Sequence, residues 1–204
     1  MHVYRRRGAL ALAAVLAAAA CADNVTAVFS QFSATLSTDQ EPTAPTGATG
    51  ASGSGTCTFS PAPTARPVAS TTTVSCTISY SGLSGAPVYA ILNAGAPGAT
   101  GTNQVWLCAP ANFATDTIAS PAVGTAKKYA QTTHSPAGVA TCPATSPIGP
   151  AGVFSATGSA GLVTPDSLYG LMLNSSGTAG TYLNIGTANN PLGEIRGIMT
   201  HPIP

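Results

Sequence analysis

Apolar and polar residues alternate most clearly between Thr71 and Tyr80. Valine, cysteine, isoleucine and tyrosine occupy every second position there, with serine and threonine between them. A period of two with many β-branched residues is typical of a strand that buries one face. We therefore expect a half-buried β-strand in this stretch.

Weaker forms of the same pattern recur along the chain, and segments rich in proline, glycine and serine separate them. The expected strands cover residues 25–36, 56–59, 71–80, 88–93, 103–108 and 153–156, with a closing hairpin over 182–197. Residues 38–55 and 60–69 are expected to be loops because their proline and glycine content disfavours regular structure.

One short helix is expected near residues 165–173. Thr164 is suited to the N-cap, Pro165 to the first helical position, and Asp166 to the positive end of the helix dipole. Many short strands and one helix predict an all-β fold, an antiparallel β-sandwich or Greek-key arrangement that is either immunoglobulin-like or barrel-like.

Charge is scarce in this chain. Charged residues make up 6% of the 204 residues, against about 25% in ordinary globular proteins. No cluster of lysine and arginine occurs beyond the N-terminus, which argues against a nucleic-acid partner.

The N-terminus has the pattern of an export signal. Residues 5–7 are three arginines, and the apolar run 8–20 is too short to span a bilayer. Cleavage before Asp23 would release a secreted protein, whereas the alanines before Cys21 resemble a bacterial lipobox, although Ala18 stands where leucine is usual. We favour lipidation at Cys21, with free secretion as the alternative.

The rest of the chain is expected to form one domain. Residues 1–22 form the signal segment and residues 23–204 the domain, with a long irregular stretch at about 109–150. Without the three N-terminal arginines, four lysines and arginines face six acidic residues, so the mature net charge is about −2.

The cysteine count agrees with export. With Cys21 set aside, four cysteines remain, a number suited to two disulfides in an oxidising compartment. Three connectivities are possible, and we favour Cys57–Cys76 and Cys108–Cys142 because each joins near neighbours in sequence. No Cys-x-x-Cys motif and no histidine at ligand spacing accompany them, so we expect no metal site.

Four segments together resemble a chordin-type (CHRD) domain. They are residues 32–36 (FSATL), 53–59 (GSGTCTF), 77–85 (TISYSGLSG) and 193–197 (GEIRG), in the order the family has them. The resemblance extends over nearly the whole mature chain. In chordin it implies extracellular protein binding, a partner that bacterial members need not share.

The chain departs from this family at positions that commonly carry histidine. A His-x-His motif usually follows the YSGLSG turn, and another histidine lies in the last hairpin. The matching positions here are Ile91, Asn93 and Gly186. We therefore transfer no metal-binding or other functional residue from the resemblance.

Glu194 and Arg196 form the Glu-x-Arg pair of the closing hairpin, and their spacing places them on one face of a strand. Two interpretations are open. The pair could recognise a ligand on an exposed sheet face, or it could serve as a structural ion pair or hydrogen-bond anchor to neighbouring loops. We favour the structural role. Trp106, beside Cys108, is similarly expected to pack in the core rather than to serve as a ligand platform.

Catalytic constellations are poorly supported. His201 is expected to be a solvated tail residue and His134 a surface loop residue. A triad with Asp116 and a serine would lack the Gly-x-Ser-x-Gly elbow, and the carboxylates are too few and scattered for a glycosidase pair. We expect no catalytic residues, no metal and no cofactor.

The sequence thus favours an exported interaction module of the cell envelope or extracellular space. Its partner would be an unidentified envelope or extracellular protein, and a lipid on Cys21 would hold it at the membrane. The expected location is the periplasm, outer membrane or cell surface. A metal-binding or enzymatic domain and a passive structural envelope protein are the alternatives.

Overall fold

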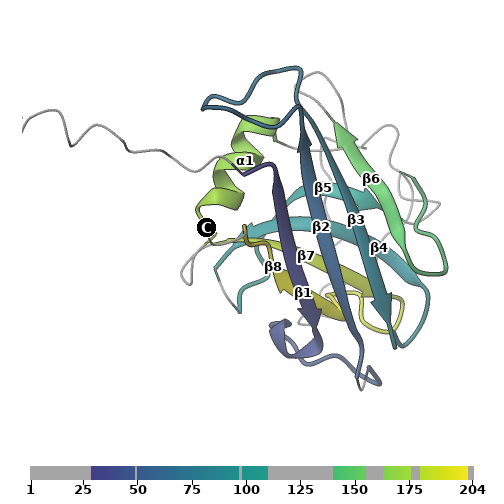
Figure 1. The fold of residues 1–204 in the computed structure, drawn as a ribbon. Helices are drawn as coiled ribbons and strands as arrows, with labels where there is room; N and C mark the ends of the chain where they lie inside the picture. Colours follow the sequence, from purple (N-terminus) through teal and green to yellow (C-terminus); the bar gives the residue numbers. More distant parts are fainter. Residues whose placement is uncertain are drawn as a thin grey trace, which may run out of the picture.

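The computed structural model describes residues 29–48, 50–96, 98–109, 140–154, 163–175 and 180–201. Within these ranges the chain forms an eight-stranded antiparallel sheet, a 3-10 turn (η1) and one α-helix (Figure 1). The strands are β1 (Gln31–Ser37), β2 (Ser52–Ser60), β3 (Thr73–Ser81), β4 (Pro87–Gly95), β5 (Thr102–Cys108), β6 (Ile148–Phe154), β7 (Gly180–Thr187) and β8 (Ile195–Ile198); η1 is Thr38–Gln40 and α1 is Pro165–Leu173.

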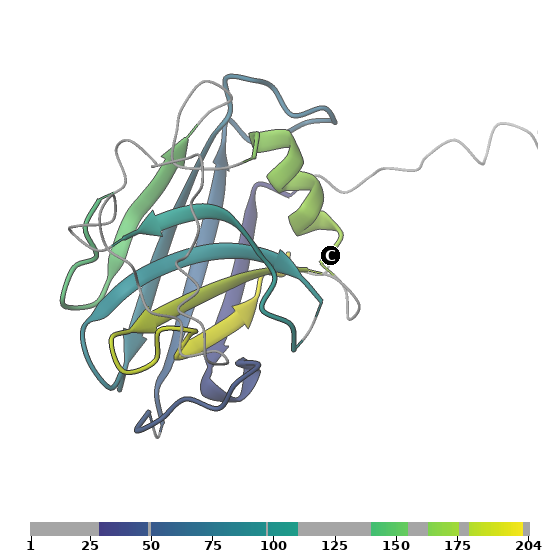
Figure 2. The same ribbon diagram turned by 180° about the vertical axis from the view of Figure 1, so that it is seen from behind.

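The sheet folds over on itself into two halves. Its order is β5-β4-β7-β8-β1-β2-β3-β6, and the half from β5 to β8 crosses behind the half from β1 to β6 (Figures 1 and 2). The halves join where Ser37 of β1 pairs with Arg196 of β8, and a bridge between Ser33 and Thr200 extends this joint. The all-β antiparallel fold with one short helix is confirmed, as a nearly closed barrel.

The main core lies between the two halves. Each strand contributes its inward positions, as the alternation in β1 and β3 predicts. Fully buried aromatic and aliphatic members include Phe32, Phe59, Ile78, Leu92, Leu107, Leu168, Leu183 and Ile185. Burying each such side chain stabilises the fold by about 1.5–3 kcal/mol.

Helix α1 closes one end of this core. Tyr169 packs edge-on against Phe32 and Phe59, with ring centroids 5.8 and 5.1 Å apart. The hydroxyl of Thr164 accepts a hydrogen bond from Ser167 N at 3.2 Å, so the expected N-cap is present. Asp166 in the first turn binds the Arg66 guanidinium, which fixes the loop before β3 to the helix.

Two strands begin well before their expected first residues. Strand β2 begins at Ser52 rather than 56, because Gly53 and Gly55 lie in the sheet instead of a loop. A Cβ on Gly55 would overlap the side chain of Leu183 from the opposite half, so the glycine makes room for core packing. Strand β6 begins at Ile148, within the stretch expected to be irregular, and Ile148 is buried in the core.

The first disulfide links neighbouring strands. Cys57 and Cys76 lie directly opposite each other in the β2–β3 register, with Cα atoms 4.1 Å apart. Both are buried in the core, as their shared face with apolar residues predicts.

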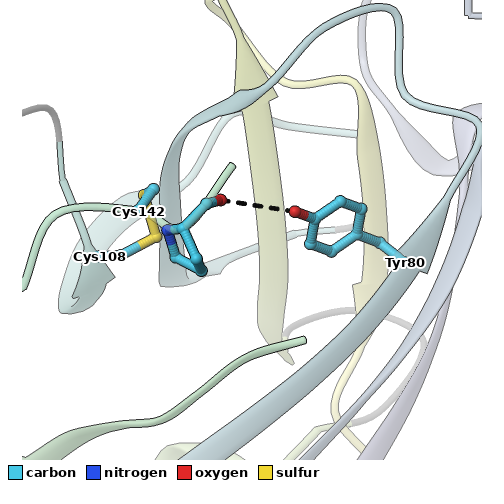
Figure 3. The surroundings of a disulfide bond; sticks show 4 residues. Tyr80, Cys108 and Cys142 are labelled. Carbon is cyan, nitrogen blue, oxygen red and sulfur yellow. Dashed lines mark hydrogen bonds between the residues drawn. A yellow bond between two sulfur atoms is a disulfide. The ribbon is translucent and has the colours of Figure 1, made fainter. Parts of the chain in front are cut away.

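The second disulfide joins the two ends of the sheet. Cys108 ends edge strand β5, and Cys142 precedes β6 at the opposite edge. Ala109 and Thr141 form a parallel bridge beside the bond. The Tyr80 hydroxyl of β3 reaches the carbonyl of the residue after Cys142, as Figure 3 shows. This disulfide therefore brings together the edges that would otherwise leave the barrel open.

Some sequence predictions fall outside the described residues. These are the signal segment 1–22, the lipidation candidate Cys21 and most of the stretch 109–150. Among the residues that are described, no helix is both long and apolar enough to cross a membrane.

Removing either disulfide should lower the free energy of unfolding. Loops of 19 and 34 residues predict losses of roughly 3 and 4 kcal/mol. Urea denaturation of the Cys57→Ala/Cys76→Ala and Cys108→Ala/Cys142→Ala variants measures both. We expect the second variant to lose more, because its bond also joins the sheet edges; equal stability of both variants and the wild type would contradict the closing role.

Candidate functional site

The closing hairpin of β7 and β8 brings together the polar residues that the composition makes rare. Glu194 lies immediately before β8, and its backbone N–H donates to Ile185 O at 2.7 Å. Its side chain is fully buried rather than exposed on a sheet face. Arg196 is also buried, but it lies in a different environment, and the two side chains form no ion pair with each other in the described part of the chain.

The Glu194 carboxylate is held by a network of hydrogen bonds, here called the Glu194 network. Ser84 donates to it from both its backbone N–H and its hydroxyl, the latter at 2.6 Å. Thr187 donates its hydroxyl, and Asn190 donates its amide at 2.9 Å. Four donors therefore replace the water that the buried carboxylate has lost.

This network ties three loops together. Ser84 belongs to the β3–β4 turn, whereas Thr187 ends β7 and Asn190 belongs to the β7–β8 turn. Asn190 also exchanges hydrogen bonds with the backbone of Thr46 in the β1–β2 loop, at 2.7 and 3.2 Å. The YSGLSG turn and the GEIRG block are thus joined by hydrogen bonds in a single structural network.

Hydrogen bonding sets the protonation of Glu194. Burial by itself raises the pKa of this carboxyl, but the donors from Ser84, Thr187 and Asn190 favour the ionised form and together lower the pKa below its usual value. The carboxylate is therefore ionised and saturated with hydrogen bonds at neutral pH, which suits a structural role and not that of a general acid or base.

A second polar group lies on the outer face of the β4–β7–β8 half, away from the main core. It consists of Asn93, Tyr182, Asn184 and Arg196, here called the outer-face cluster. Asn93 pairs with Tyr182 across β4 and β7, and Asn184 pairs with Arg196 across β7 and β8. All four residues are buried, so a sheet face that would ordinarily be solvated holds amide and guanidinium groups away from water.

Arg196 is held at two points. Its Nη1 donates to Ala99 O of the β4–β5 turn at 2.6 Å, and its guanidinium carbon lies 3.8 Å from the centroid of the Tyr182 ring. Its Nε and Nη2, the hydroxyl of Tyr182 and the amide oxygens of Asn93 and Asn184 are buried without a hydrogen-bond partner among the described residues. Each such group costs about 1–3 kcal/mol, and more when it is charged.

Glu41, in the loop after η1, lies close enough to Arg196 to interact electrostatically. Burial raises the pKa of Glu41 to about 8, and the attraction of Arg196 opposes that shift without reversing it. Its carboxylate packs over Gly193, whose φ of +135° and missing side chain leave the necessary space. The alternation pattern gave no sign of Glu41, because it lies in a proline-rich loop.

The three positions that match the common histidine positions of the resemblance lie on this same outer face. Ile91 and Asn93 are on β4, and Gly186 is opposite Tyr89 on β7. The Tyr89 ring occupies the place that a side chain at Gly186 would take. At these three positions the face therefore carries the Ile91 side chain, the Asn93 amide and the Tyr89 ring that covers Gly186, and it carries no histidine there.

The remaining candidates do not converge on a site. His201 stacks on the Phe29 ring at 3.9 Å and is half-buried, so the expected tail residue packs against the fold on one side. Trp106 is buried beside Tyr89, edge to face at 6.2 Å, on the outer face rather than in the main core. His134 and Asp116 lie outside the described residues. Within the described ranges, no three histidine, cysteine or acidic residues group together as metal ligands.

Comparison with known families finds one match, which spans the described sheet. The family model of the CHRD domain matches residues 32–199, which is most of the chain. The match begins in β1 and ends just after β8, so it contains both the Glu194 network and the outer-face cluster. No curated protein and no solved structure is detectably similar to the chain.

Replacing Glu194 by glutamine should destabilise the fold at neutral pH by about 2 kcal/mol or more, because charge-assisted hydrogen bonds are lost. The folded pKa lies below the unfolded value of 4.5, so the contribution of the carboxylate is complete above pH 4.5. It disappears as the pH falls through the folded pKa. Urea denaturation of Glu194→Gln and wild type across this range tests it; a difference that persists in acid would contradict the account.

Replacing Glu41 by glutamine should have the opposite pH dependence. The folded pKa of about 8 exceeds the unfolded value of 4.5, so the unfolded state loses its proton first as the pH rises. Glu41→Gln should therefore gain stability over wild type between pH 4.5 and about 8, on the order of 4 kcal/mol at the upper end. Asp39→Asn removes one charge from the same region as a control. A constant difference across this range would refute the burial of an ionisable Glu41.

Proposed function

The chain belongs to the CHRD domain family, and from that premise we propose that it is an exported, non-catalytic interaction module of the cell envelope. CHRD domains are modules of extracellular and exported proteins and are generally not enzymes. The partner class that this proposal names is an envelope or extracellular protein.

The observation that best supports a binding role is that the hydrogen bonds of Glu194 stabilise the fold and leave this carboxylate unsuited to catalysis. It is the carboxylate of the most distinctive block of the sequence, and its four hydrogen bonds serve the fold. Asp166 is likewise occupied by Arg66. The described carboxylates are therefore either structural or isolated, an arrangement that favours a rigid recognition scaffold over a reaction centre.

Export is supported by independent features of the chain. The basic and apolar N-terminal segment has the form of a signal, and Cys21 follows an alanine run that resembles a lipobox. The other four cysteines lie in two disulfides, which persist in oxidising compartments. We propose that Cys21 carries a lipid and holds the barrel at a membrane surface, by way of residues 22–28.

Crosslinking in intact cells, combined with palmitate labelling, tests this proposal. We expect the full-length protein to incorporate label, to fractionate with the envelope and to crosslink to a discrete envelope or extracellular protein. Cys21→Ala should lose the label and leave the membrane fraction while retaining the fold. An unlabelled wild type would refute the anchor, and a wild type that crosslinks to nothing at the envelope would refute the interaction role.

A further inference from the structure

Arg196 occupies the corner where the two halves of the barrel meet. It pairs with Asn184 of β7 on one side and with Ser37 of β1 on the other. Only 1% of its surface is exposed. Its Nη1 donates a hydrogen bond to Ala99 O, and the face of its guanidinium packs on the Tyr182 ring. The Nε and Nη2 groups remain, buried and unmatched by any group in the described residues.

These two groups form one edge of the guanidinium, the edge that grips a carboxylate with two parallel hydrogen bonds. Arg66 of the same chain shows this arrangement. Its Nε and Nη2 donate to the two carboxylate oxygens of Asp166, at 3.1 and 2.9 Å. Arg196 presents the same edge in a drier setting, where a paired carboxylate would interact more strongly than at the surface.

The described carboxylates do not fill this edge. Asp166 is taken by Arg66 and Glu194 by its own network. Glu41 acts on Arg196 only through space, since no ion pair within 4.0 Å joins them in the described part of the chain. Asp39 is exposed on η1.

The neighbours of Arg196 add a second, independent indication. The amide oxygens of Asn93 and Asn184 and the hydroxyl of Tyr182 are also buried and lack a partner among the described residues. Amide oxygens accept hydrogen bonds, so they suit N–H or O–H groups next to a bound carboxylate. The cluster therefore combines a fork for an anion with acceptors for its polar substituents.

We propose that the outer-face cluster is a binding site for a carboxylate, gripped by the Nε–Nη2 edge of Arg196 and flanked by Asn93, Tyr182 and Asn184. The carboxylate can come from a small free acid or from an acidic side chain of a partner polypeptide. Both sources share the chemistry that the site recognises. The site does not depend on the role proposed above, because either source would occupy it.

Thermal-shift titration of the full-length exported protein tests the site. The probes are acetate, N-acetyl-aspartate amide and the isosteric N-acetyl-asparagine amide, which lacks the negative charge. We expect saturable stabilisation by the two carboxylates and none by the amide. Stronger binding of the blocked aspartate would indicate a polypeptide source, and stronger binding of acetate a small acid. No saturable shift with either carboxylate would overturn the proposal.

Variants distinguish recognition by two parallel hydrogen bonds from attraction by positive charge alone. Arg196→Lys keeps a positive charge but loses the fork, and we expect at least about a thirtyfold weaker Kd. Arg66→Lys, which breaks the exposed fork far from the cluster in sequence and fold, is the matched control and should bind as wild type does. Equal affinity of Arg196→Lys and wild type would overturn the proposal.

Two further variants keep the test decisive if Arg196→Lys fails to fold. Asn184→Asp places a carboxylate directly opposite Arg196, so it should raise Tm and abolish binding of the added carboxylates. Unchanged binding by Asn184→Asp would overturn the proposal. Asp116→Asn removes a carboxylate that lies outside the described residues. Binding that appears only in this variant would show that the chain fills its own fork, which would also overturn a ligand site.

Discussion

The buried carboxylate of Glu194 is the constraint on which the arrangement of this barrel depends. An unpaired carboxylate could not remain ionised at this depth, so the fold must supply donors. The donors come from Ser84, which lies 110 positions earlier, and from Thr187 and Asn190, which shortly precede Glu194. Meeting this requirement fixes the β3–β4 turn, the β7–β8 turn and the β1–β2 loop relative to one another.

That constraint has a consequence for Arg196, two residues further on. The Glu194 backbone pairs with Ile185, so the register of β8 against β7 is set at this point. Register decides which face each side chain takes, and it places Arg196 opposite Asn184 on the outer face. Gly197 then lets β8 approach β1 closely, because a Cβ there would overlap the Thr35 carbonyl. Residues 193–197 therefore fix the joint between the two halves of the barrel and also orient the guanidinium of Arg196.

Local sequence patterns predicted the strands and the helix of this fold better than they predicted which segments contact each other. The alternation before Tyr80 and the Thr164-Pro165-Asp166 start of α1 both appear in the structure, because each depends on neighbours in sequence. The preferred cysteine pairing also matches the structure. It joins near neighbours along the chain, and the register of β2 and β3 places Cys57 beside Cys76.

The site was harder to predict, because its contacts join distant segments. The spacing of Glu194 and Arg196 suggested a shared face, but Glu194 lies before the strand and points into a hydrogen-bonded network. The alternation also could not reveal that β4 and β7 are buried on both faces, since either face of a strand may be covered by residues far away in sequence. Nothing local marks Glu41 as a member of the site, and the YSGLSG motif that contains Ser84 does not by itself reveal the contact with Glu194.

The most direct test of this account is a carboxyl ¹³C NMR titration of the folded protein. It reports the protonation of Glu194 itself, independently of stability. The account predicts that the Glu194 carboxyl titrates below its ordinary value of 4.5, whereas Glu41 titrates near 8. A Glu194 carboxyl that titrates at or above its ordinary value would contradict the network of donors on which the rest of the structure depends.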